Sequence, residues 1–147
     1  MAQYFDPHTS HYFLVEFDGT TAGRFQEVSG LGGSNEVYEI KEGGLNDHSH
    51  KFVTRTTYND LVLKRGFWND PSLFRWFEGV ALSTWTERRD GSIILLQGKE
   101  SDEVARWNFM RAFPTKWDGP TFNATASAAA MESCTLTCEW IEMVLPG

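Results

Sequence analysis

The chain has 147 residues, of which 41% are hydrophobic and 14% aromatic, and its formal net charge is −7. This composition excludes a disordered chain, and the length favours a single domain over residues 1–147. The acidic balance, without a cluster of Lys and Arg, argues against a nucleic-acid-binding protein.

The chain shows no targeting signal. Its first ten residues, MAQYFDPHTS, have neither the basic nor the apolar segment of a signal peptide, so we expect synthesis in the cytoplasm. No apolar run reaches the roughly 18 residues of a membrane span. Cys134 and Cys138 are too few for a disulfide framework and too far apart on one strand to be bridged, so we expect reduced core thiols.

Strand patterns dominate the first half. Residues Tyr12–Phe17 begin with apolar side chains on both faces, which predicts that a second surface covers them, within the subunit or from a neighbour. The sequence predicts further short strands at Arg24–Ser29, Glu36–Lys41, Phe52–Thr57 and Leu61–Lys64, with a glycine-rich turn at Gly30–Gly33.

One helix is predicted over about residues 71–82. Asp70 followed by Pro71 is typical of an N-cap and a first helical position. Apolar residues then recur at helical spacing, namely Leu73, Phe74, Trp76, Phe77, Val80 and Ala81.

The second half predicts longer strands. Residues 87–96 indicate a hairpin with Asp90-Gly91 at its turn, leading into a strand that is apolar on both faces and therefore central. The next strand is expected over Glu103–Phe113, with Pro114 helping to end it and with Trp107, Phe109, Arg111 and Phe113 on one face. A small-residue tract at 124–130 is expected to be an exposed loop.

A last strand is predicted over Met131–Val144, with one apolar and one polar face. The inward residues are Cys134, Leu136, Cys138 and Trp140, and the outward ones are Ser133, Thr135, Thr137 and Glu139. The whole pattern amounts to about eight to ten strands and one helix, which predicts a mainly β fold: a small β-barrel or sandwich with a packed helix.

Candidate chemistry is weak. His48 and His50 would share one face of a strand beside Asp47, but no third ligand is placed, so we expect no metal. Neither cysteine lies in an electropositive context, and there is no nucleophile-elbow or phosphate-loop motif. We therefore expect neither catalysis nor a cofactor.

Several stretches, in order, resemble the tail tube proteins of contractile phages, most closely the inner tube proteins of phage-tail-like extracellular contractile injection systems. They are FQEVSGL (25–31), EIKEGGLNDHSHKF (39–52), LVLKRG (61–66), ERRDGSIILL (87–96), VARWNFMRAFPTKWDGP (104–120) and MESCTLTCEWIEMV (131–144). The resemblance covers nearly the whole chain, from about residue 5.

This resemblance implies a tail-tube fold similar to the Hcp tube protein of type VI secretion. Six subunits would form a ring, and rings would stack into a hollow tube inside a sheath, bounded by a baseplate with its spike hub and by a terminal cap. The assembled tube would pierce a target membrane and carry cargo in its lumen. The subunit would be structural, leaving the cytoplasm within a phage tail or phage-tail-like particle.

Two sets of residues are expected to make the assembly contacts. By resemblance, a loop that reaches the adjacent subunit or the next ring contains Gly43, Gly44, Leu45, Asn46, Asp47 and His48. The polar face of the last strand, with Ser133, Thr135, Thr137 and Glu139, is expected to line the channel or to meet a neighbour.

Two other functions fit the sequence. A baseplate subunit that initiates the tube would share the fold, although the short loops of this chain favour the main tube. A Trp-rich glycan-binding module belongs to another class, since the chain has six Trp residues.

Overall fold

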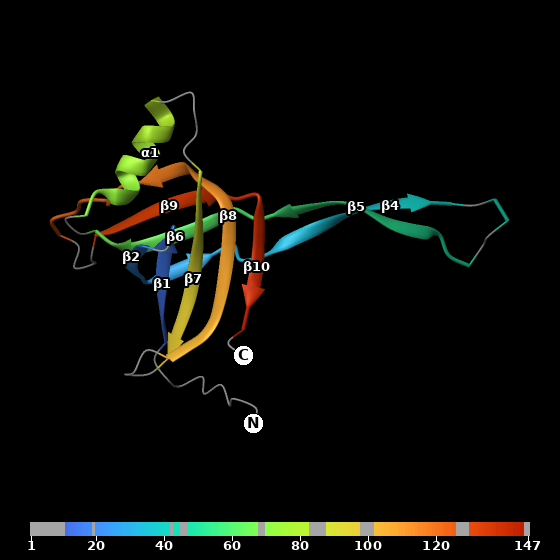
Figure 1. The fold of residues 1–147 in the computed structure, drawn as a ribbon. Coiled ribbons are helices and arrows are strands. Elements are labelled where there is room, and N and C mark those ends of the chain that lie inside the picture. Colours follow the sequence, from blue (N-terminus) through green and yellow to red (C-terminus); the bar gives the residue numbers. More distant parts are fainter. Residues whose placement is uncertain are drawn as a thin grey trace.

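The computed structural model describes residues 11–18, 20–41, 43–44, 47–67, 70–82, 88–97, 102–125 and 130–145. Within these ranges the predicted β-rich fold with one helix is confirmed (Figure 1). The elements are β1 His11–Phe17, β2 Thr20–Phe25, β3 Glu27–Ser29, β4 Gly33–Ile40, β5 His50–Tyr58, β6 Leu61–Gly66, α1 Ser72–Leu82, β7 Arg89–Gln97, β8 Asp102–Asp118, β9 Met131–Thr137 and β10 Trp140–Val144.

The body is one curved sheet in the order β2-β1-β7-β8-β9-β6-β3, with β10 added to β8. The prediction of one continuous strand over Arg24–Ser29 is wrong. The segment divides at Gln26 into β2, which pairs with β1, and β3, which pairs with β6. The Gln26 N–H donates to the carbonyl of Lys64 at 2.9 Å. The two ends of the sheet therefore meet through the chain itself, and no ladder between described strands closes the barrel.

Strand β8 is longer than the sequence predicted and bends in the middle. Arg111 has φ of 53°, and its N–H donates to the Asp90 carboxylate at 2.8 Å. This bend breaks the predicted alternation, so that Ala112 is buried while Arg111 is exposed. Pro114 does not help to end the strand, because it lies at a register shift against β9, where an absent N–H is tolerated.

The predicted Asp90-Gly91 hairpin turn is also wrong. Both residues lie within β7, which pairs with β1 on one side and β8 on the other. A side chain at position 91 would meet the Phe109 ring and would place its Cβ 2.5 Å from the carbonyl oxygen of Glu16. Glycine is therefore required here for close packing at a bulge, and the prediction of a central strand after it is confirmed.

The single last strand predicted over Met131–Val144 is two strands. It breaks at Cys138-Glu139, where the Glu139 N–H donates to the carbonyl of Met110 at 3.0 Å. Strand β9 then lies between β6 and β8, whereas β10 pairs with the earlier part of β8. Because of this break, Trp140 is 50% exposed, whereas the sequence predicted that it points into the core.

Helix α1 covers one end of the sheet (Figure 1). It begins as predicted, since the Asp70 carboxylate accepts the Ser72 N–H at 3.0 Å. Its buried residues are Leu73 and Trp76, and the Trp76 ring packs edge-on against Phe17 at 5.0 Å. Burial of a side chain such as Leu73 contributes about 1.5–3 kcal/mol. No helix in the described ranges is long and apolar enough to cross a membrane.

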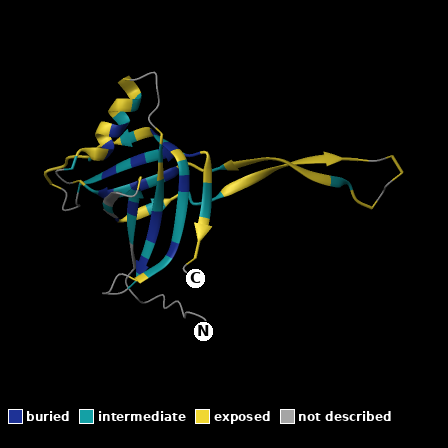
Figure 2. Ribbon diagram, in the orientation of Figure 1, coloured by how far each residue is buried: buried dark blue, intermediate teal, exposed yellow. Residues whose placement is uncertain are grey.

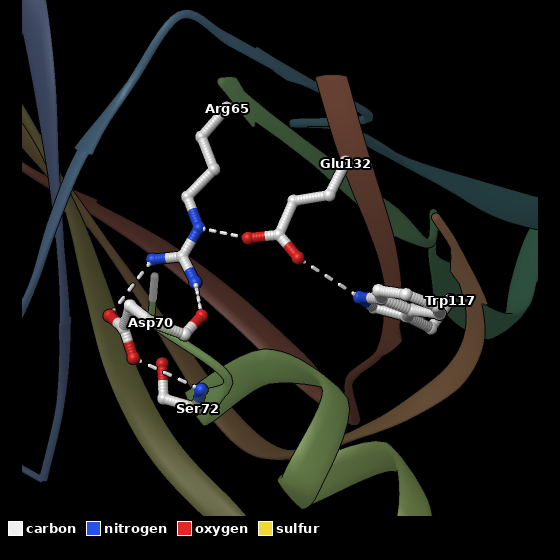
Figure 3. A network of polar contacts seen from close by, with 5 residues as sticks. All are labelled: Arg65, Asp70, Ser72, Trp117 and Glu132. Carbon is white, nitrogen blue, oxygen red and sulfur yellow. Dashed lines mark hydrogen bonds and ion pairs between the residues drawn. The ribbon is translucent and has the colours of Figure 1, made fainter. Parts of the chain in front are cut away.

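A buried ion network joins the helix to the sheet (Figure 3). Arg65 of β6 pairs with Glu132 of β9, and its guanidinium also donates to the backbone carbonyl of Asp70 at 3.1 Å. The second Glu132 oxygen accepts the indole N–H of Trp117 at 3.2 Å. Two strands, the helix cap and β8 are thereby held in one arrangement.

The pKa of Asp70 lies below its usual value. Partial burial raises this pKa, but the hydrogen bond from the Ser72 N–H and the charge of Arg65 lower it by more. A carboxyl with a lowered folded-state pKa stabilises the fold at neutral pH and loses this contribution as the pH falls through that pKa.

We predict that Glu132→Gln lowers the free energy of unfolding by about 3 kcal/mol, because it leaves the Arg65 charge buried with its main counter-ion removed. Urea unfolding at neutral pH measures this loss.

The matched control is Glu27→Gln, which removes the partner of Lys64 in an ion pair whose side chains are 58% and 43% exposed. This change is expected to cost less than about 1 kcal/mol. Equal losses from the two variants would contradict the structural role of the buried pair.

Candidate assembly interface

Strands β4 and β5 form an arm that projects from the body (Figure 1). They pair with each other from Gly33 opposite Tyr58 to Ile40 opposite His50, and no other described strand joins their sheet. Every residue of β4 is exposed, as are those of β5 between its two ends (Figure 2). A two-stranded ribbon is at best marginally stable alone in water, so the arm is suited to gaining stability from a partner.

Apolar side chains occur on both faces of the arm. Tyr38 lies opposite Phe52 on one face, and Val37 lies opposite Val53 on the other. Their exposed fractions are 58%, 52%, 56% and 64%, respectively. Exposed apolar residues gathered in this way are typical of a protein–protein contact surface.

The two strands of the arm carry opposite charges. The charged residues of β4 are Glu36 and Glu39, and those of β5 are Lys51 and Arg55. Glu36 lies opposite Arg55 and Glu39 opposite Lys51, which favours this pairing register. One long edge of the arm is therefore acidic and the other is basic.

The loop predicted to contact a neighbour connects the two strands of the arm. Gly43, Gly44, Asp47 and His48 are exposed, whereas Leu45 and Asn46 lie outside the described residues. Gly44 has φ of 92°, a conformation that residues with a Cβ rarely adopt. The His48 and His50 rings are 5.9 Å apart, and no group of three potential metal ligands occurs among the described residues.

Sequence analysis predicted a contact in this loop and did not single out the exposed side chains of Tyr38, Phe52 and Val53 on the flanking strands. A local signal for them was present, since both strands have apolar residues at odd and even positions. Such a pattern usually indicates a strand buried between two layers, and here no described layer covers either face.

Only three of the four residues predicted for the polar face of the last strand lie on β9. Ser133, Thr135 and Thr137 are half-buried and alternate with buried Cys134 and Leu136. Glu139 lies beyond the end of the strand, where its carboxylate pairs with Arg88 at 2.7 Å and with Arg111 at 3.1 Å.

The two thiols are in the core and carry no disulfide. Burial raises the pKa of the Cys134 thiol to about 12, and the nearby Glu132 charge adds to this effect. Burial also raises the pKa of Cys138. Because the thiolate is the reactive form, neither group is activated as a nucleophile.

The family model for T4-like virus tail tube protein gp19 matches residues 9–142. The chain is similar to one from a PVC sheath-tube complex of an extracellular contractile injection system, with 26% identity, 98% of this chain and 94% of that chain covered, and a TM-score of 0.84.

Two further solved structures share the fold. A chain in the anti-feeding prophage tube-terminating cap structure is 23% identical, with 99% of this chain and 95% of that one covered and a TM-score of 0.84. Hcp1 from Flavobacterium johnsoniae is 16% identical, with 92% and 96% covered and a TM-score of 0.58. No curated protein matches the chain in sequence.

We predict that neither thiol of the native subunit reacts readily with a thiol reagent such as DTNB at pH 8, because both are buried and protonated. Both should react at once in guanidinium chloride. Rapid reaction of one thiol in the native subunit would show that the core around β9 opens easily.

Proposed function

Because this chain belongs to the T4-like virus tail tube protein family, whose model matches residues 9–142, we propose that its copies form six-membered rings that stack into the hollow inner tube of a contractile injection system or phage tail. The chain is a tail tube protein, and the family is structural. The proposal therefore requires no catalytic step and no cofactor.

The observation that carries this proposal is the exposed arm. A folded body that exposes Tyr38, Phe52 and Val53 on an unsupported ribbon has a surface that only another molecule can cover. In a ring, the arm of each copy would contact a different surface of the next copy, which makes the proposed contact heterologous. Heterologous contacts close into rings or continue as open filaments, and a stacked tube uses both outcomes.

The expected partners follow the same family. Similar chains come from a sheath-tube complex and a tube-terminating cap. We place this chain in an equivalent particle, with a sheath around the tube, a baseplate and spike hub at one end, a cap at the other, and cargo in the lumen. The assembled tube, rather than the free subunit, would penetrate a target membrane after the chain is made in the bacterial cytoplasm.

The alternative functions have less support. A tube-initiating baseplate subunit would be present in six copies per particle, whereas a main tube subunit would be present in many, so the copy number per particle separates these two roles. A glycan-binding module would need a platform of exposed indoles. Among the described residues, Trp140 is 50% exposed, whereas Trp76 is 4% exposed and Trp117 donates its indole N–H to Glu132.

We predict that the purified protein at high concentration forms six-fold rings or hollow rods in negative-stain electron microscopy. A sample with baseplate components would show whether a template is required.

The double variant Tyr38→Ser with Phe52→Ser should form neither rings nor rods, because the arm loses its apolar contacts. Its free energy of unfolding should change by less than about 0.5 kcal/mol, since both residues are exposed.

The matched control is Phe122→Ser, which removes an 81% exposed aromatic residue from the body and should assemble normally. A second arm variant, Gly44→Lys with Leu45→Glu, tests the loop at the end of the arm separately. Monomers of the wild-type protein in both samples, or normal tubes from the Tyr38 and Phe52 variant, would refute the assembly role of the arm.

We further propose that the polar face of β9 lines the channel or lies against a neighbouring subunit. Thr135→Cys in sealed, intact tubes should then resist a bulky thiol reagent added from outside, while the same variant reacts as a free subunit. The buried native thiols keep the background low. Ready labelling of intact tubes from outside would exclude the channel position.

A further inference from the structure

Two histidines lie together where the terminal loop of the arm joins β5. His50 is the first residue of β5, and His48 precedes it by two positions. Their ring centroids are 5.9 Å apart, and the ring planes are inclined at 77° to each other. His48 is exposed and His50 is half-buried, so the pair is open to solvent. Two imidazoles this close together can act as joint ligands of one ion.

The local backbone places both rings on one face of the arm. Side chains of an extended chain alternate between its two faces, so positions 48 and 50 share one face and position 49 takes the other. The Ser49 hydroxyl shows this alternation, because it donates to the carboxylate of Glu39 on the facing strand. Glu39 lies opposite Lys51, an odd-numbered residue on the same face as Ser49. The contact with Glu39 therefore directs Ser49 away from the two imidazoles.

The distance between the two rings is close to that of a metal chelate. When two imidazoles bind one ion with metal–nitrogen distances of about 2.1 Å, their ring centres lie about 5 Å apart. The observed separation of 5.9 Å differs from this by about 1 Å, which a small rotation of the exposed His48 side chain can supply. Chelation therefore requires no change in the backbone of the arm.

The number of ligands decides which metals fit. Among the described residues, no third potential ligand joins the two histidines, so they do not form a closed zinc site with four protein ligands. An open site with two imidazoles and water suits Cu²⁺ and Ni²⁺, which favour a tetragonal arrangement of nitrogen and oxygen ligands. The net charge of −7 favours the approach of a cation.

We propose that His48 and His50 chelate a divalent late transition-metal ion, with Cu²⁺ bound most tightly, and that water completes its coordination. The site belongs to the single folded subunit. It goes beyond the proposed tube function, which does not require it. A bound ion fixes residues 48–50 in the extended conformation and thereby holds the end of the terminal loop in line with β5.

The test titrates the free subunit with Cu²⁺ in a buffer that does not bind copper. Calorimetry measures the affinity, and electron paramagnetic resonance reports the number of coordinated nitrogens. We expect one tightly bound ion with two imidazole nitrogens. His48→Ala and His50→Ala should each weaken binding by at least about tenfold, because each leaves one imidazole without the gain from chelation. Ni²⁺ and Zn²⁺ should bind the wild-type site more weakly than Cu²⁺.

Two matched variants separate chelation from the mere presence of histidine. His48→Ser combined with Ser49→His keeps the composition but places the two imidazoles at adjacent positions, on opposite faces. It should bind Cu²⁺ as weakly as the single variants do. His11→Ala removes a histidine from β1 and should bind Cu²⁺ like the wild type. Circular dichroism and urea unfolding check that each variant has a folded body.

The outcomes decide the proposal directly. Unchanged copper affinity in either single variant, an equal loss from His11→Ala, or a wild-type spectrum with a single coordinated nitrogen would overturn the site. A loss confined to the variants that break the His48–His50 pair would establish it. Because every measurement uses free subunits, none of these results depends on whether the protein forms tubes.

Discussion

The strand β8 is the element on which the rest of the body depends, because it pairs with three other strands. Its first part carries β7 on one side and β10 on the other, and its last part carries β9. The bend at Arg111 lets one strand serve both regions of the curved sheet while Phe109 and Ala112 still enter the same core. A straight strand would turn the core residues of one region towards water.

The buried ion network completes this arrangement at the helix end. Hydrophobic contacts of Leu73 and Trp76 hold α1 on the sheet without defining one orientation, since apolar contacts are non-directional. The hydrogen bonds that link Arg65 with Glu132 and Asp70 are directional and specify where the helix begins. A subunit that repeats along a tube benefits from one orientation, because any variation would recur at each contact.

The arm takes part neither in the strand pairing around β8 nor in the buried ion network. The body contains the buried core, and the arm adds no buried residue to it. Its apolar side chains gain burial only when another molecule covers them. The hydrophobic surface is thus divided between the core, which β8 and α1 complete within one subunit, and the arm, whose exposed Tyr38 and Phe52 we propose as an assembly contact.

Local patterns in the sequence determined the elements whose causes are local. The Asp70-Pro71 cap and the helical period predict α1 correctly, and the alternation of Cys134 and Leu136 predicts the buried face of β9. A strand-rich fold with one helix and the position of the arm's terminal loop followed from such patterns. Together with the family resemblance, they also indicated a structural role in assembly.

Only the tertiary structure decided the features that depend on distant residues. Gly91 is typical of a turn by itself, but contacts with β1 and β8 place it inside a strand. Arg111 bends β8 because the Asp90 carboxylate from another strand accepts its N–H. The exposure of Tyr38 follows from the lack of a described layer above the arm. These outcomes depend on which strands become neighbours, and short-range periodicity carries no information about that choice.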